Sequence, residues 1–287
     1  MNQSSNYLKS LFAAAALLAT ASSIFAKDIL FVGNSFTHIP RGFTVSSGDT
    51  SSAPTLTGIP AIVHTMAQNS GKQFNIQMET AGGQTLEWHS QTNMDRLLQG
   101  WDVVILQEYS TRLLHTSCKA PGANISAYRA AVDEISKVLR AQNPEVKIIL
   151  YQTWARPDLV ESGLFTDIES MQKELIMTSR NAAKDFKCEL APVGEAFMSA
   201  VKLGYADDPS TIKQEGAYSL WGGDHYHQGR HGAYLSAAIF YAMLFDKDPR
   251  NLAGELNSAA TQLRIDPEAA KNLQQLAYDF TVNKPDF

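Results

Sequence analysis

The sequence predicts one doubly wound α/β domain, built around a mostly parallel sheet of about five strands. Short apolar segments alternate along the chain with longer segments of helical periodicity, a pattern typical of a sheet flanked by helices. Two short segments, residues 103–106 and 148–150, are continuously apolar, as strands covered on both faces require. No internal repeat, low-complexity tract or linker marks a second domain.

Five strands are expected in chain order, at residues 28–32, 73–78, 103–107, 146–151 and 189–191. Helical patterns cover residues 59–68, 125–142, 167–186, 233–245 and 267–280. Residues 40–60 are rich in Gly, Ser, Thr and Pro without a period, so a surface loop is expected there. A loop after the first strand lies beside the carboxyl ends of the strands, where open α/β folds bind ligands, so it is expected to shape substrate access.

Residues 1–26 have the three-part layout of a secretory signal peptide. A polar start with one positive charge is followed by an apolar run over residues 11–21 and then by small residues, with cleavage expected after Ala26 or Ala21. The apolar run is short for a membrane span, so removal is expected rather than stable membrane insertion. The mature domain, residues 27–287, is expected to be exported to the periplasm or the cell exterior.

The charge balance argues against a polyanionic partner. Lys and Arg number 24 against 29 Asp and Glu, and no stretch gathers the basic residues into a patch. An electrostatic grip on nucleic acid is therefore not expected. The oligomeric state is left open.

The chain has two cysteines, Cys118 and Cys188. An oxidising compartment would permit a disulfide between them, but their separation in sequence leaves a bond and two small buried residues equally open. Neither cysteine has a metal-binding or redox spacing, so no catalytic thiol is expected.

A candidate nucleophile follows the first expected strand, which runs directly into Gly33-Asn34-Ser35. A serine on a tight turn at the carboxyl edge of a sheet is exposed to substrate, and the amides of a following helix can stabilise an oxyanion. The same residues also make an ordinary turn, so this serine needs partners.

Partners are available near the other end of the chain. Asp224 and His227 lie three residues apart in a glycine-led loop just before a predicted helix. The carboxylate can accept a hydrogen bond from one imidazole nitrogen, which leaves the other nitrogen to take the proton of Ser35. Loops at the same edge of a parallel sheet can meet despite their distance in sequence. Together these residues predict ester hydrolysis through an acyl-serine intermediate.

Three blocks together resemble the SGNH/GDSL hydrolase superfamily, in its exported esterase and carbohydrate acetylesterase-like branch: Gly33-Asn34-Ser35, Gly82-Gly83 and Asp224-x-x-His227. Their order and spread match that family from Asp28 to about Phe245. The resemblance implies a flavodoxin-like three-layer sandwich, with Ser35 as nucleophile, His227 as base and Asp224 orienting the base. It also implies an oxyanion hole formed by the serine amide, a glycine amide and usually an asparagine side chain.

The remaining oxyanion donors are assigned by the same resemblance. Gly83 takes the glycine position, with Gly82 as the near alternative, although a plain strand-to-helix turn would also use two glycines. The third block departs from the family's Gly-x-Asn-Asp, because the chain has Gln107-Glu108-Tyr109-Ser110. Gln107 carries the same amide on a longer arm and is expected to complete the hole, while Tyr109, Ser110 and a structural role for Gln107 stay open.

Two candidate substrate contacts follow the fourth expected strand. Trp154 offers a flat face for a sugar ring, and Arg156 a planar donor for a polar or carboxylate substituent. Their place at a strand end favours substrate contact, while a core tryptophan and an ion-paired arginine are the alternatives. The other histidines are expected to be structural, with His38 near enough to Ser35 to line the pocket; they are His38, His64, His89 and His115.

The predicted substrate is a small-molecule or glycan ester, with removal of O-acetyl or another short acyl group from a carbohydrate favoured. No metal or other cofactor is expected for this chemistry. Three alternatives stay open: acyl transfer to a sugar hydroxyl, glycan binding without turnover, and a metallohydrolase. The last would use His225, His227 and His231 with Asp224, and would leave Gly33-Asn34-Ser35 unexplained.

Overall fold

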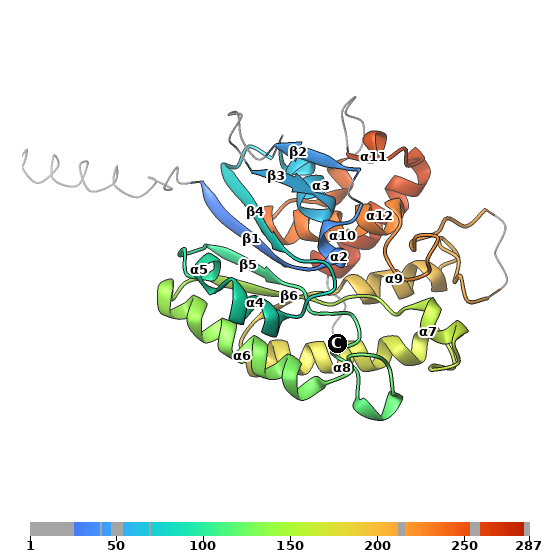
Figure 1. The fold of residues 1–287 in the computed structure, drawn as a ribbon. Helices are drawn as coiled ribbons and strands as arrows, with labels where there is room; N and C mark the ends of the chain where they lie inside the picture. The colour runs from blue at the N-terminus through green and yellow to red at the C-terminus, as the bar shows by residue number, and fades with distance from the viewer. Residues whose placement is uncertain are drawn as a thin grey trace, which may run out of the picture.

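The centre of the molecule is a five-stranded parallel sheet (Figure 1). A computed structural model of the chain describes residues 26–40, 42–46, 54–68, 70–211, 216–252 and 259–283. Except for Ala26, the expected signal peptide lies outside these residues. The strands are β1 (Lys27–Gly33), β4 (Phe74–Thr80), β5 (Val103–Leu106), β6 (Lys147–Tyr151) and β7 (Glu189–Ala191).

The spatial order of the sheet is β4-β1-β5-β6-β7, with every neighbouring pair parallel. In chain order this is 2-1-3-4-5, the flavodoxin-like arrangement, so the α/β class and the topology are as expected. The order reverses between β1 and β5, where Val32 pairs with Leu106. Ligands of open α/β sheets bind at such a switch point, outside the carboxyl ends of the strands.

Helices cover both faces of the sheet (Figure 1). One face carries α3 (Gly58–Ala67), α10 (Arg230–Phe245) and α12 (Pro267–Thr281), and the other carries α4 (Leu86–Thr92), α6 (Ile125–Gln142) and α8 (Ile168–Asp185). The shorter elements are α2 (Ser35–His38), α5 (Met94–Leu97), η1 (Thr116–Cys118), α7 (Pro157–Glu161), α9 (Val193–Lys202), η2 (Pro249–Leu252) and α11 (Ala259–Gln262). None of the helices in the described ranges is long and apolar enough to cross a membrane.

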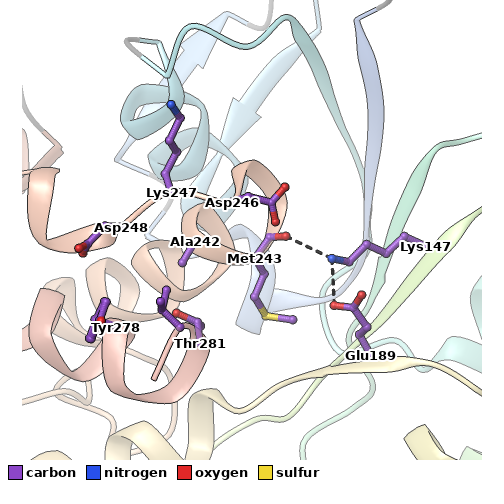
Figure 2. Close-up of a pocket in the computed structure, with 10 residues that line it drawn as sticks. Lys147, Glu189, Ala242, Met243, Asp246, Lys247, Asp248, Tyr278 and Thr281 are labelled. Carbon is purple, nitrogen blue, oxygen red and sulfur yellow. Dashed lines mark hydrogen bonds and ion pairs between the residues drawn. The ribbon is translucent and has the colours of Figure 1, made fainter. Parts of the chain in front are cut away.

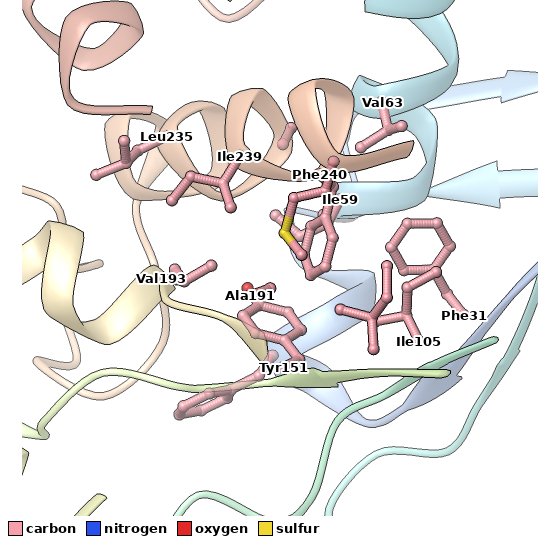
Figure 3. Close-up of a cluster of buried hydrophobic side chains, with 14 of the residues drawn as sticks. Phe31, Ile59, Val63, Ile105, Tyr151, Ala191, Val193, Leu235, Ile239 and Phe240 are labelled. Atoms are coloured by element: carbon pink, nitrogen blue, oxygen red, sulfur yellow. The ribbon is translucent and has the colours of Figure 1, made fainter. Parts of the chain in front are cut away.

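Helix α10 fixes the core on its face of the sheet (Figure 3). Its residues are buried almost throughout, because it lies between the sheet, α3 and α12. The ring of Phe240 contacts that of Phe31 at 5.4 Å between centroids and that of Tyr151 at 4.9 Å, both edge to face. Such aromatic pairs add about 0.5–1.5 kcal/mol each beyond the area they bury. The start of α10 is thereby held over the carboxyl edge of the sheet.

The expected loop at residues 40–60 is partly wrong. Its ends pair as a two-stranded antiparallel ribbon of β2 (Thr44–Ser46) and β3 (Thr55–Thr57). Threonine, valine and leucine at these positions suit extended backbone, and β3 leads directly into α3. Residues 47–53, between the two strands, lie outside the described part.

Both cysteines are free thiols. Cys188 lies 3.7 Å from the hydroxyl of Ser136, and Cys118 ends the short turn η1. Of the two arrangements that the sequence left open, the structure has the unbonded one.

Candidate active site

The turn after β1 presents Ser35 as the first residue of α2. The side chain of Asn34 accepts a hydrogen bond from the amide of Phe36 and donates one to the carbonyl of Gln84, at 3.1 and 2.9 Å. Gly33 is required here by close packing, since a Cβ would lie 2.6 Å from Gln107 Oε1. Local capping and one glycine therefore aim Ser35 at the switch point.

Ser35, His227 and Asp224 form a continuous hydrogen-bonded chain. Ser35 Oγ lies 2.8 Å from His227 Nε2, and His227 Nδ1 lies 2.7 Å from Asp224 Oδ2. With Nδ1 protonated, the ring donates to the carboxylate and its Nε2 accepts from the serine hydroxyl. This is the geometry of a nucleophile, a base and an orienting acid.

The carboxylate of Asp224 is stabilised in its charged form. Desolvation opposes that charge, but hydrogen bonds from the His227 side chain and from the amides of Tyr226 and His227 outweigh it and lower the pKa of Asp224. Both amides donate to Oδ1 at 3.0 Å, which leaves Oδ2 for the imidazole. Asp224 is therefore ionised and fixed in orientation wherever His227 has to act as a base.

The loop that carries Asp224 and His227, residues 222–228, is called the catalytic loop below. It closes on itself through the bond from the Gly222 amide to the His227 carbonyl, at 2.7 Å, and His225 adopts a left-handed backbone with φ of 54°. On its other side, Gln228 Nε2 donates to the carbonyls of Phe36 and Ile39, at 2.9 and 2.6 Å. Gln228 thus connects the loop directly to the helix that begins with Ser35.

Gln107 does not occupy the place expected for an oxyanion donor. Its side chain is fully buried, its Oε1 accepts from the amide of Asn34 and the hydroxyl of Thr37, and its Nε2 donates to the carbonyl of Glu108. An oxyanion has to lie in space that substrate can reach. Gln107 is therefore a support for the nucleophile turn, the structural alternative that the sequence left open.

The glycine turn lies beside the nucleophile turn. The amide of Ala81 donates to the carbonyl of Gly33, and Asn34 bonds to Gln84, so both ends of residues 81–84 are attached to the turn that carries Ser35. Gly83 has φ of 74°, a conformation that favours glycine. Within the described residues, the Gly83 amide donates no hydrogen bond. Its role as an oxyanion donor remains a prediction compatible with this placement.

Trp154 is not available to a substrate. Its side chain is 0% exposed and is stacked between the rings of Phe36 and Phe197, at 4.5 and 4.7 Å between centroids. Its indole nitrogen donates to the carbonyl of Tyr226 at 3.1 Å. The expectation of sugar stacking is wrong, because both ring faces are covered by side chains from distant segments. Trp154 instead supports both the nucleophile helix and the catalytic loop.

Arg156 is likewise occupied. It is 9% exposed, pairs with both carboxylate oxygens of Asp158, and donates to the hydroxyl of Ser110 at 3.2 Å. Its guanidinium lies 3.7 Å from the ring centre of Tyr226, within reach of a cation–π interaction. The ion-pair alternative holds, and the predicted substrate contact is wrong.

The histidines proposed as metal ligands turn to separate partners. His225 Nδ1 lies 2.6 Å from the carboxylate of Glu161. His227 is hydrogen-bonded to Asp224 and Ser35. His231 stacks on Tyr218 with 4.7 Å between the ring centroids. In the part of the chain that the structure describes, no group of three or more His, Cys, Asp or Glu side chains could hold a metal ion.

The four other histidines occupy separate positions. His38 lies near the glycine turn, with Nδ1 3.3 Å from the Thr80 hydroxyl. The rest have other partners: His64 packs on Phe74, His89 contacts the carbonyl of Gly33, and His115 contacts Ser117.

Two supporting residues were missed in the sequence, Gln228 and Glu108. Glu108 is 2% exposed, and its Oε1 accepts from the amides of Leu86 and Tyr109, which joins the start of α4 to the end of β5. Desolvation raises the pKa of Glu108 to about 7. Both residues directly follow residues that were singled out, but their amide and carboxyl groups carry no periodic signal that would reveal burial.

A cavity at the other edge of the sheet is unrelated to this site (Figure 2). It has a volume of about 570 Å³ and lies where β6 and β7 begin. Lys147 Nζ there bonds to the carbonyl of Met243 and to the carboxylate of Glu189, at 3.2 and 2.9 Å. Since parallel strands begin at one edge and end at the other, this cavity is separated from Ser35 by the length of the sheet.

The sheet is flavodoxin-like, and Ser35, His227 and Asp224 form one hydrogen-bonded chain at its switch point. These features place the protein in the class of α/β proteins that carry a Ser-His-Asp arrangement at the carboxyl ends of the strands. Within that class, the chain has the fold of the SGNH/GDSL hydrolases. No protein-family profile and no curated protein matches the chain.

Solved structures with this fold cover most of the chain at low identity. A Bacteroides uniformis protein of the DUF4886 family is 17% identical, with 91% of this chain and 98% of that chain covered and a TM-score of 0.60. A Slackia heliotrinireducens protein, described as a candidate SGNH hydrolase, is 19% identical, with 77% and 100% covered and a TM-score of 0.55. Axe2, an acetylxylan esterase from Geobacillus stearothermophilus, is 16% identical, with 79% and 97% covered and a TM-score of 0.55.

Proposed function

We propose that the protein is a serine ester hydrolase that works through an acyl-enzyme intermediate. The observation that carries this proposal is the chain of contacts from Ser35 Oγ to His227 Nε2, at 2.8 Å, and from His227 Nδ1 to Asp224, at 2.7 Å. Both distances allow proton transfer without rearrangement. The likeness in fold to SGNH/GDSL hydrolases supports the same reaction class.

In the proposed reaction, Ser35 Oγ attacks the ester carbonyl carbon while His227 Nε2 takes its proton. The amides of Ser35 and Gly83 stabilise the oxyanion, and one such donor contributes roughly 10²–10³ in rate. Collapse of the tetrahedral intermediate expels the alcohol, which receives the proton from His227. A water molecule, activated by the same histidine, then releases the acid and restores Ser35. Asp224 stays ionised and holds the imidazole throughout.

The proposed substrate is an O-acetylated carbohydrate. One solved structure of the same fold is an acetylxylan esterase, and the layout of residues 1–26 supports export to a compartment where polysaccharide esters occur. Trp154 and Arg156 do not support this substrate, because neither is accessible. Export itself is tested by the mass of the mature protein, which should begin at Lys27 or, for cleavage after Ala21, at Ser22.

The test combines a substrate panel with a change at the nucleophile. Ser35→Ala should abolish hydrolysis of p-nitrophenyl acetate and labelling by a fluorophosphonate, while the thermal unfolding midpoint stays near that of the wild type. The wild type should prefer acetate over longer acyl esters and should keep its activity in a chelator. Activity of Ser35→Ala equal to that of the wild type would overturn the proposal, and loss of activity in the chelator would point to the His225 and His231 metal alternative.

A further inference from the structure

Glu108 is a buried acid at the end of β5 that the proposed reaction does not use. It is 2% exposed, and its Oε1 accepts hydrogen bonds from the amides of Leu86 and Tyr109, at 3.2 and 2.5 Å. Its Oε2 is buried and has no hydrogen-bond partner among the described residues. The carboxyl group therefore acts through one oxygen, which bonds the end of β5 to the first residue of α4.

The preceding residue, Gln107, makes the corresponding link to the nucleophile turn. Its Oε1 accepts from the amide of Asn34 at 2.8 Å and from the hydroxyl of Thr37 at 2.9 Å, and its Nε2 donates to the carbonyl of Glu108 at 2.5 Å. Asn34 directly precedes Ser35. Two adjacent residues of one strand end are thus bonded to the nucleophile turn and to the helix that follows the glycine turn.

The two proposed oxyanion donors lie close to these links. Within the described part of the chain, neither the Ser35 amide nor the Gly83 amide donates a hydrogen bond, so both are available to a ligand. Ser35 follows Asn34, and Gly83 comes three residues before Leu86. An oxyanion accepts from its donors at about 2.7–3.1 Å, so the relative position of the two amides has to be held within about 0.5 Å.

Helix α4 is attached to this frame at two buried points. The Leu86 amide bonds to Glu108, and His89 Nε2 donates to the carbonyl of Gly33 at 2.9 Å. Two attachments fix the direction of the helix, whereas one would let its first turn rotate about the other. Loss of the acceptor on Glu108 would leave the Leu86 amide buried without a partner and would release the glycine turn from the end of β5.

We propose, on the basis of the proposed function, that Glu108 is a positioning residue for the oxyanion hole, whose carboxyl group holds the Gly83 amide in register with the Ser35 amide. In place of the side-chain donor expected of Gln107, the end of β5 supplies the frame for two main-chain donors. The effect belongs to the transition state, because the oxyanion forms only there. It should therefore appear in kcat more than in KM.

The first test uses the mature protein with p-nitrophenyl acetate at pH 6. Glu108→Met keeps the length of the side chain and removes the acceptor. Complete loss of one oxyanion donor costs roughly 10²–10³ in kcat, so a displaced donor should lower kcat about ten- to a hundred-fold, with KM within about two-fold of the wild type. Burial raises the pKa of Glu108 to about 7, so at pH 6 Glu108→Gln resembles the protonated carboxyl group. Since Glu108→Gln keeps Oε1, it should restore most of the lost kcat.

A second measurement separates positioning from general loss of structure. Ser35 Oγ adds to the carbonyl carbon of 1,1,1-trifluoroacetone, its proton passes to His227, and the ketone oxygen becomes an oxyanion in the hole. Binding of this ketone therefore reports the oxyanion donors directly, and its Ki should rise about ten- to a hundred-fold in Glu108→Met, in step with the fall in kcat. A smaller folded fraction would lower kcat and leave Ki unchanged.

Leu86 provides a second pair of variants that leaves Glu108 in place. Leu86→Pro removes the amide that Glu108 accepts, at the first residue of α4, where proline suits a helix. Leu86→Ala is its matched control, because it loses side-chain packing and keeps the amide. Leu86→Pro should show the lower kcat and the higher Ki of the two. This pair decides the question if Glu108→Met does not fold.

Glu195→Met controls for the loss of a buried acid. Glu195 is 8% exposed and accepts from Gln152 and Arg180, with no bond to either turn. The variant should lower the thermal unfolding midpoint and leave kcat and Ki near the wild-type values.

The outcomes distinguish the two proposals. Equal kcat and Ki in Leu86→Pro and Leu86→Ala, or a folded Glu108→Met variant with the wild-type Ki, would refute the positioning role alone. A Glu108→Gln variant as impaired as Glu108→Met would refute it as well, because the shared Oε1 would then not be the group that matters. Hydrolysis retained by Ser35→Ala would instead refute the proposed function.

Discussion

The side-chain amide of Gln228 lies 2.9 Å from the carbonyl oxygen of Phe36, so the residue after His227 is bonded to the residue after Ser35. A second bond from the same nitrogen reaches the carbonyl of Ile39. Gln228 is 2% exposed, and its Oε1 is buried without a partner, a cost of about 1–3 kcal/mol. The distance between Ser35 and His227 is therefore set by the bonds from the Gln228 side chain to the main chain after Ser35 as well as by their own hydrogen bond.

Replacing Gln228 should separate the nucleophile from its base. Gln228→Met keeps the length of the side chain and removes both donors, so kcat for p-nitrophenyl acetate should fall about ten- to a hundred-fold with KM nearly unchanged, because proton transfer depends steeply on geometry. Gln274→Met is the matched control, since Gln274 is equally buried and donates to Tyr234 between α12 and α10. Equal kcat losses in the two variants would show that Gln228 acts through stability alone.

Trp154 should affect catalysis without affecting substrate choice. Trp154→Phe loses the hydrogen bond to Tyr226 and part of the stack under Phe36, so we expect a loss of about 1–3 kcal/mol in the free energy of unfolding and a lower kcat. Trp101→Phe is the control, because Trp101 is also buried and donates to a main-chain carbonyl, but at the start of β5. A rise in KM for a sugar ester alone would restore the stacking role rejected above.

Glu108 should make stability depend on pH. The folded state holds the proton of this carboxyl up to a pKa of about 7, whereas the unfolded state releases it near the ordinary 4.5. Between these values the folded state binds more protons, so the free energy of unfolding falls as pH rises, by up to about 3 kcal/mol in total. Urea unfolding of Glu108→Gln at pH 5, 6, 7 and 8 should show a flatter dependence than the wild type. Glu145→Gln, at an exposed position, should leave the wild-type slope intact.

Thiol labelling should find two free cysteines. Burial raises the pKa of Cys188, which leaves less thiolate at pH 7, so Cys188 should react slowly with iodoacetamide in the folded protein and fully after unfolding. Peptide mass spectrometry resolves Cys118 from Cys188. A disulfide-linked peptide containing both residues in the non-reduced protein would contradict the structure.

The strands, and the meeting of Ser35, His227 and Asp224, could be predicted from the sequence because each has a local signature. Val103–Leu106 is continuously apolar and is found as β5, and Ser35 and His227 each follow or lie among glycines at a predicted element boundary. Helix α9 was missed because it follows Pro192 and contains Gly194, which reads as a break. In the structure a Cβ on Gly194 would meet Gln172 and the carbonyl of Thr153 at 2.2 Å.

The roles of Trp154 and Gln107 depended on contacts that no local pattern encodes. Trp154 is enclosed by Phe36 and Phe197, which come from segments far apart in the chain. Gln107 has the amide expected of an oxyanion donor, but its Nε2 donates to the carbonyl of Glu108, its Oε1 accepts from the Asn34 amide, and the side chain is buried. Residue types at strand ends thus pointed to the carboxyl ends of the strands as the place of the candidate site. Which of those side chains a substrate can reach depends on their burial.

Ser35 and His227, between which the proton is proposed to pass, lie 192 positions apart in the sequence. This separation affects the stage of folding at which the two side chains meet. The helix α10 that follows the base packs against α3 and the sheet, so the base reaches Ser35 only after the last third of the chain has closed over the first. Long-range contacts of this kind form late, because the loop entropy is lost before they can compensate for it. Recovery of esterase activity should consequently lag behind recovery of secondary structure on refolding, and a chain interrupted before residue 227 would carry a serine with no base.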